Sequence, residues 1–134
     1  MYMRLYILFC TISFCVLIGS CTKEKKETER DFPRVATGLV TNLNSTGVTF
    51  NGSFLQVGSN EIIDHGFVYD EHSVPNIIIS EKISLGPSSG NGSFTARASH
   101  ELKIGKTYYV SAYARNKDKI FYAESVSFVS QGGQ

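Results

Sequence analysis

The sequence has no tryptophan, only three prolines and almost no excess charge of either sign. Twelve glycines beside so few prolines favour a turn-rich β protein over a disordered or collagen-like chain. Arg4 is the only charged side chain before Cys21, so the rest of the chain carries 13 − 1 = 12 basic and 12 acidic side chains. A neutral chain lacks the basic surface that nucleic acid binding requires, and we predict no nucleic acid partner.

Sequence motifs for catalysis are also missing. The sequence contains no Gly-x-Ser-x-Gly, no phosphate-binding glycine loop and no paired-carboxylate motif. His65, His72 and His100 are scattered along the chain, which gives no zinc site of recognisable spacing. We therefore expect a protein that is not an enzyme and that holds no metal or cofactor.

Long apolar runs are absent except at the N-terminus, over residues 5–18. This run follows Arg4 and precedes the small residues Gly19 and Ser20, and it is shorter than the ~20 apolar residues of a membrane-spanning helix. A positive start, a short apolar segment and small residues at its end are typical of an export signal. We predict a signal peptide over residues 1–20.

The tetrad Ile18-Gly19-Ser20-Cys21 resembles the lipobox of bacterial lipoproteins. The resemblance implies that Cys21 becomes the first residue, with diacylglycerol on its sulfur and an acyl chain such as palmitate on its amine. Several chains hold a protein on a membrane far better than one, since each buried CH₂ contributes about 0.8 kcal/mol. An ordinary signal peptide with a chance cysteine stays open as the alternative. Cys10 and Cys15 would leave with the signal, so the mature chain could form no internal disulfide.

Residues 21–32 form a charged segment between the lipid site and the predicted domain. The segment resembles the tethers of lipoproteins from Bacteroidota, and Thr22 in place of an aspartate favours the outer membrane. Its charges are mixed rather than acidic, so both the periplasmic face and the cell surface stay open. A solvated spacer with no export role is the simpler interpretation of the charge run.

Apolar residues after the tether alternate as β-strands require. In residues 102–116 a turn at Gly105 leads into a strand on which Tyr108, Val110, Ala112 and Ala114 share one face. Residues 88–92 carry an Asn-Gly pair, which tolerates the positive φ angles of a tight hairpin and predicts one there. Seven strands are predicted: residues 35–43, a strand with Val48 and Phe50, 62–70, 77–85, a strand with Phe94, Ala96 and Ala98, the strand from Tyr108, and 120–129.

The segment from Leu102 to Tyr108 resembles the tyrosine corner of fibronectin type III domains. In that family a leucine precedes a turn, and a tyrosine opens the next strand and bonds back to the backbone. The resemblance implies a seven-stranded, immunoglobulin-like β-sandwich over residues 33–129, followed by a polar tail over residues 130–134. Gly52 stands where many relatives carry a core tryptophan, which predicts a bulge or a close backbone approach there.

The opposite face of the strand from Tyr108 is the predicted interaction surface. If Tyr108 faces the core, Tyr109, Tyr113 and Arg115 face outward, and exposed Tyr and Arg are favoured contact residues. Depending on its register, the neighbouring strand could extend this face with either Phe67 and Tyr69 or His65. Ordinary cross-strand pairing without any ligand is the simpler alternative.

These patterns predict a lipid-anchored, non-enzymatic envelope or surface protein whose sandwich binds a protein or a glycan. A structural accessory subunit of an outer-membrane or periplasmic complex is the alternative. A subunit predicts a large apolar patch, whereas a hydrolase or metal protein would need residues gathered from separate strands.

Overall fold

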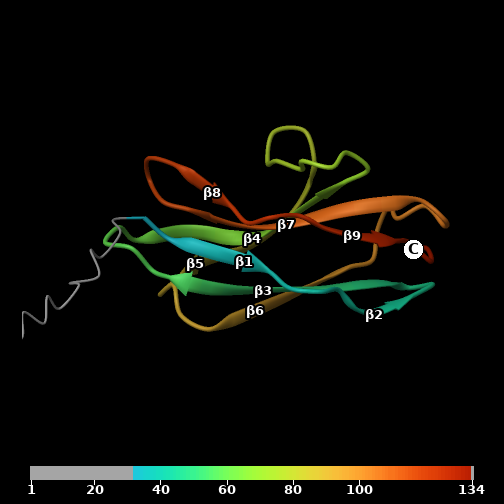
Figure 1. Cartoon of the computed structure of the whole chain (residues 1–134), viewed down its shortest axis with the longest axis horizontal. Helices are drawn as coiled ribbons and strands as arrows, with labels where there is room; N and C mark the ends of the chain where they lie inside the picture. Colours follow the sequence, from blue (N-terminus) through green and yellow to red (C-terminus); the bar gives the residue numbers. More distant parts are fainter. Residues whose placement is uncertain (1–31, 134) are drawn as a thin grey trace, which may run out of the picture.

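The computed structural model describes residues 32–133, which form two antiparallel β-sheets packed face to face, with no helix in this range (Figure 1). Nothing helical in residues 32–133 is long and apolar enough to cross a membrane. The predicted signal peptide, Cys21 and the tether up to residue 31 lie outside the described residues.

The two sheets divide the strands as follows. The first sheet contains β1 (Arg34–Thr37), β2 (Thr41–Asn44), β3 (Gly47–Gln56) and β6 (Ser93–Ala98), and β3 pairs with the other three. The second contains β4 (Ile62–Asp70), β5 (Glu81–Ser88), β7 (Thr107–Arg115), β8 (Ile120–Tyr122) and β9 (Val126–Val129). In it β4 lies between β5 and β7, and the other edge of β7 pairs with β8 and β9. The predicted β-sandwich is confirmed.

Nine strands form in residues 32–133 where the pattern predicted seven, because the first and last predicted strands are each interrupted. The first breaks into β1 and β2, where the Asn51 side-chain amide donates to the Leu39 carbonyl at 2.8 Å. The last breaks into β8 and β9, where Ala123 N donates to Ala112 O at 2.9 Å. Both interruptions depend on contacts that period-two alternation does not record.

Two connections also differ from the predicted ones. The strand expected over residues 77–85 begins only at Glu81, because Ser80 N donates to Asn76 O at 3.1 Å and closes a turn before it. The Asn-Gly segment does turn, with φ of 79° at Gly90 and 80° at Gly92. It joins β5 of one sheet to β6 of the other, however, and is therefore not a hairpin.

The core lies between the sheets and is centred on Phe50 of β3. The Phe50 ring contacts Phe67, Tyr69 and Phe128, with centroids 5.6, 5.2 and 5.7 Å away. Tilted aromatic pairs at such distances add to the area they bury. No tryptophan is needed to fill this layer.

Gly52 is where a second ring, that of Phe94 on β6, comes close to the backbone of β3. A β-carbon at Gly52 would lie 2.7 Å from two atoms of the Phe94 ring. The close approach predicted at Gly52 is thus present, but a side chain makes it. The predicted bulge is absent, since Gly52 pairs regularly with Thr37 and Phe94.

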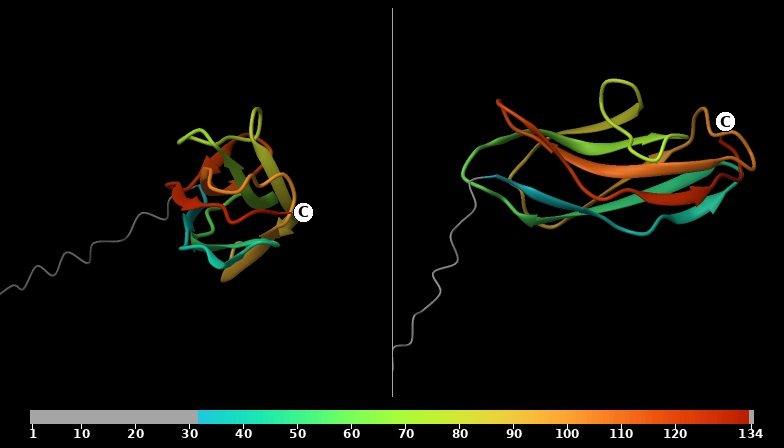
Figure 2. Two further views of the ribbon diagram at one scale, coloured as in Figure 1. Left: turned by 90° about the vertical axis from the view of Figure 1, so that its right-hand side faces the viewer. Right: turned by 45° about the horizontal axis from the view of Figure 1, so that its top comes forward.

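The sandwich is elongated, and the described chain enters at one end and finishes at the other (Figures 1 and 2). Phe32 stacks on Phe121 at the entry end, with ring centroids 5.9 Å apart. Residues 130–133 continue the fold at the opposite end, where Ser130 N donates to Lys106 O at 2.8 Å and Ser130 is 2% exposed.

Candidate functional site

The tyrosine corner lies at the same end as the last residues. The Tyr108 hydroxyl accepts from Lys103 N at 3.1 Å and donates to Glu101 O at 3.2 Å. Leu102 is buried, and Gly105 has a φ of 74° that favours glycine. These bonds fix the turn before β7, so Leu102, Gly105 and Tyr108 have a structural role here.

The predicted face of Tyr109, Tyr113 and Arg115 is not the exposed surface that we expected. Tyr113 is 0% exposed and Tyr109 is only partly exposed, while Arg115 alone is open to solvent. The alternatives on β4 fail too, since Phe67 and Tyr69 belong to the core and the His65 ring packs edge-on against Phe94. The prediction of an exposed aromatic face was wrong.

A loop lies beside part of this outer face. Residues 71–80, here named the covering loop, project from the outer side of the second sheet (Figure 1). Ile77 N donates to the Tyr122 hydroxyl at 3.2 Å, and the Ser125 hydroxyl donates to Ser73 O at 2.9 Å. Val68, on the same outer face of β4, is 0% exposed. Alternate side chains of β7 do point to the outer face of the sheet, as predicted, but this face is largely shielded from solvent.

Under the outer face, Tyr113 belongs to a polar cluster that joins three strands. Its hydroxyl donates to Asp64 Oδ2 at 2.8 Å, and Asp64 also accepts from Ser84 Oγ and from Gly86 N. Partial burial opposes ionisation of Asp64, but these hydrogen bonds and the charge of Lys82 outweigh it and lower its pKa. Burial and the bond to Asp64 raise the pKa of Tyr113. The cluster stabilises the sheet and offers no free group.

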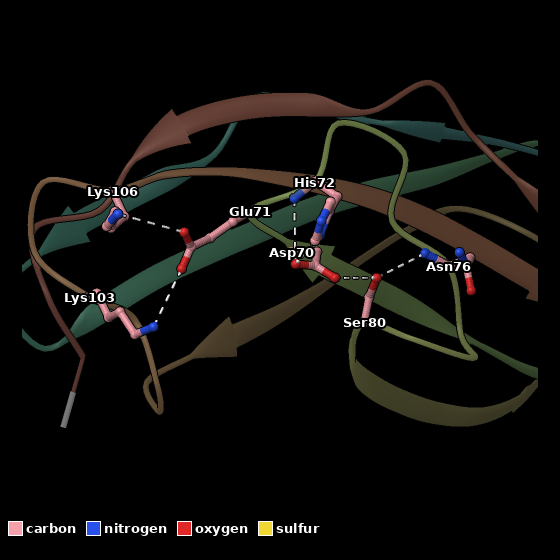
Figure 3. A network of polar contacts seen from close by, with 7 residues as sticks. All are labelled: Asp70, Glu71, His72, Asn76, Ser80, Lys103 and Lys106. Atoms are coloured by element: carbon pink, nitrogen blue, oxygen red, sulfur yellow. Dashed lines mark hydrogen bonds and ion pairs between the residues drawn. The ribbon is translucent and has the colours of Figure 1, made fainter.

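The covering loop is held by hydrogen bonds at its base as well as at its tip (Figure 3). The Ser80 hydroxyl donates to Asp70 Oδ2 at 3.0 Å and accepts from Asn76 N at 3.1 Å. Asn76 Oδ1 accepts from Ile78 N at 3.0 Å, which closes a local turn. Buried Pro75 adds a fixed φ near the middle of the loop. The loop is therefore preorganised.

Three aliphatic side chains of this loop point into solvent. Val74 is 77% exposed, Ile78 is 89% exposed and Ile79 is 66% exposed. Single exposed apolar residues are common, but three on one short ordered loop form a small apolar surface. Loops carried by a rigid scaffold are favoured places for binding. We name Val74, Ile78 and Ile79 the aliphatic tip.

A cleft of about 500 Å³ opens beside Ile79. Its floor contains the buried residues Tyr69, Leu102 and Tyr108. Its remaining lining is mostly charged and consists of Asp70, Glu71, Glu81, Glu101 and Lys103, together with Ile79 and Gly133. We name this the Tyr69 cleft.

A smaller cleft, of about 350 Å³, lies on the other side of the covering loop. It separates residues 73–76 from residues 122–125, and Ser111 lines it from the sheet. The hydroxyl of Ser111 already donates to Ala123 O at 2.7 Å. This cleft therefore presents few free polar groups.

The histidines and acidic residues of residues 32–133 do not gather into a metal-binding group. No group of three or more His, Cys, Asp or Glu in this range could hold a metal ion. His65 Nδ1 lies 2.7 Å from Gly86 O, and His72 Nδ1 lies 3.2 Å from Asp70 Oδ1. Asp64 and His65 point to opposite faces of β4, as strand alternation requires.

Sequence reasoning missed the covering loop because it assigned residues 77–85 to a strand. One signal was available: three consecutive isoleucines at positions 77–79 cannot all face the core of a strand with one buried side. The Pro75-Asn76 pair before them favours a turn. Read together, these residues indicate an apolar loop.

Comparison with known proteins bears on the fold. No protein-family model matches the chain, and no curated protein matches it in sequence. Among solved structures, the sensor domain of the anti-sigma factor RsgI4 from Pseudobacteroides cellulosolvens is similar, with a TM-score of 0.56 and 14% sequence identity. The match covers 75% of this chain and 95% of that domain. At such low identity, the similarity supports the β-sandwich and says nothing about a ligand.

Proposed function

We propose that this chain is a lipid-anchored, non-enzymatic envelope protein whose β-sandwich binds another protein through the covering loop. The observation that carries the proposal is the aliphatic tip, which a network of hydrogen bonds holds in solvent. A preorganised loop loses little conformational entropy on binding, which favours affinity. The fold is one that a sensor domain also uses, which agrees with a binding or sensing role.

A protein ligand is favoured over a glycan by the side chains that are exposed. Sugar binding relies on exposed aromatic rings, but Tyr113 is buried and Tyr109 is partly covered. Tyr122 is more exposed, but its hydroxyl already accepts a bond from Ile77 N of the covering loop. The aliphatic tip instead supplies methyl groups that fit an apolar surface on a partner.

The position of the tip and cleft agrees with an anchor at Cys21. The described chain begins at one end of the sandwich and finishes at the other (Figure 2). Gly133, at the finishing end, lines the Tyr69 cleft. A chain tethered through its N-terminus would therefore direct this cleft away from the lipid, towards a partner.

The test places a photo-crosslinking residue at Ile78 in cells and compares it with the same residue at Leu39. Leu39 is 79% exposed but lies outside the covering loop, so it controls for exposure. We expect a discrete protein adduct at position 78, none at position 39, and loss of both adduct and membrane association in the Cys21→Ala variant.

Equal crosslinking at both positions would contradict a binding role for the loop. Membrane association that survives Cys21→Ala would contradict the lipid anchor. Protease treatment of intact and of broken cells, in the same strains, assigns the protein to the cell surface or to the periplasmic face.

A further inference from the structure

Tyr69 is a largely buried residue whose polar group has no hydrogen-bond partner within residues 32–133. The residue is 6% exposed, yet its hydroxyl forms no hydrogen bond with any described residue. No fully buried side-chain N or O atom in residues 32–133 lacks a partner, so this hydroxyl must open into the cleft that Tyr69 lines. A ligand atom or solvent is needed to satisfy it.

The charges around this hydroxyl are unequal. Lys103 Nζ and Lys106 Nζ both pair with Glu71, at 3.6 and 3.9 Å, so this group of three keeps a single positive charge (Figure 3). Asp70, Glu81 and Glu101 outnumber it and leave the cleft net negative. Glu81 and Glu101 also line the cleft, and neither forms an ion pair with a described residue.

The two free carboxylates act on the hydroxyl itself. Burial, and then the charges of Glu81 and Glu101, raise the pKa of Tyr69 to about 12. The phenol is therefore neutral at physiological pH, and its oxygen can accept a hydrogen bond from a cation. Glu101 is held at the rim in a left-handed conformation, with φ of 60°, and its carbonyl accepts the bond from Tyr108.

We infer that the Tyr69 cleft binds the cationic side chain of a lysine or arginine on a protein partner. The Tyr69 hydroxyl would accept a hydrogen bond from the ammonium or guanidinium group, and Glu81 and Glu101 would supply the opposite charge. Ile79 and Leu102 would contact the methylene stem of the same side chain. This inference rests on the proposed function and names the chemistry of the partner next to the aliphatic tip.

The test uses the full chain in detergent, with ¹³C-labelled isoleucine methyl groups observed by NMR. The ligands are three peptides, acetyl-Gly-X-Gly-amide, in which X is lysine, arginine or uncharged norleucine. We expect a saturable shift of the Ile79 methyl resonance with the lysine and arginine peptides. The norleucine peptide should bind about tenfold more weakly, since it lacks the charged hydrogen-bond donor.

Two variants remove the proposed contacts without disturbing the fold. Tyr69→Phe deletes a hydroxyl that has no partner in the described chain, so it should keep the wild-type urea midpoint yet bind the lysine peptide about threefold or more weakly. Glu81→Gln should weaken binding about threefold because it removes one of the opposite charges. The effect is modest because Glu81 is exposed and solvent screens its charge. Glu61→Gln, at the far end of β4, is the matched control and should bind as wild type.

Equal affinity for the lysine and norleucine peptides would overturn the inference. So would unchanged binding of the lysine peptide in both Tyr69→Phe and Glu81→Gln. If the crosslink at Ile78 persists in either case, the inference fails while the proposed function stands, so the two can be separated.

Discussion

Asp64 lies on β4 and accepts hydrogen bonds from both neighbouring strands. Ser84 and Gly86 donate from β5, and Tyr113 donates from β7. The carboxylate therefore links all three strands on the outer face of the second sheet. Its lowered pKa means that folding favours the ionised form.

Asp64→Asn should change how stability depends on pH. The folded pKa of Asp64 lies below its unfolded value, so its contribution is fully present above about pH 4 and is lost as pH falls through the folded pKa. We expect Asp64→Asn to be less stable than wild type at about pH 6, and the difference to shrink towards about pH 3. Urea unfolding at several pH values measures this difference.

Asp70 also has a lowered pKa: burial raises it, but hydrogen bonds from the side chains of His72 and Ser80 and from the backbone of Glu71 and His72 together outweigh burial. Wild type and Asp64→Asn both contain Asp70, so the contribution of Asp70 cancels when their curves of stability against pH are subtracted. A difference that stays constant from neutral to acid pH would show that Asp64 does not stabilise the fold as a charge.

Among the strands, β3 and β6 contact each other where a glycine of β3 lies against an aromatic ring of β6. Gly52 faces Phe94, which also packs against Phe54, His65 and Phe67. With three rings around it, Phe94 has little room to move away from a new methyl group.

Gly52→Ala should therefore destabilise the protein by about 1–3 kcal/mol, as overpacking of a core does. Phe94→Leu removes the ring edge that the methyl group would meet, so the double variant should be more stable than the sum of the two single effects predicts. Denaturant unfolding of the four proteins in a double-mutant cycle measures the coupling, expected at about 0.5–3 kcal/mol. Additive effects would mean that the ring and Gly52 are not in contact.

The period-two alternation correctly predicted which side chains of β7 face the core. It did not predict that side chains on the outer side of the strand are buried as well. Val110, Ala112 and Ala114 are buried as their period-two spacing indicates. Ser111 and Tyr113 point the other way, yet they are buried as well. Ser111 lies beside a loop some 30 to 40 residues earlier in the chain, and Tyr113 bonds to Asp64 on the neighbouring strand. Local periodicity carries no record of such contacts.

On the scale of the whole molecule, the sandwich was predictable and the cleft was not. The tyrosine corner and the strand spacing pointed to two sheets. The Tyr69 cleft, by contrast, gathers residues from five parts of the chain: the end of β4, the covering loop, the start of β5, the corner that leads into β7 and the last described residues. Only the folded arrangement brings these side chains together.

The elongated shape gives a prediction about orientation at a membrane. A fluorescent label at Asp118 lies in the loop between β7 and β8, and this loop is at the end where the described chain begins (Figure 1). His100 lies at the opposite end, next to Glu101, which lines the cleft. The nine residues of β7 separate these ends by about 30 Å. In vesicles that carry a lipid-bound acceptor dye, Asp118→Cys should transfer more energy than His100→Cys.

The lipid on Cys21 would block its thiol, so the introduced cysteine is the only one in the mature chain that reacts with the label. A chain lacking residues 1–21 is the control and should show no transfer from either position, because it has no anchor. Equal transfer from both labels in the anchored protein would mean that the sandwich lies along the membrane. The Tyr69 cleft would then face the lipid as much as a partner, which contradicts a membrane-distal binding end.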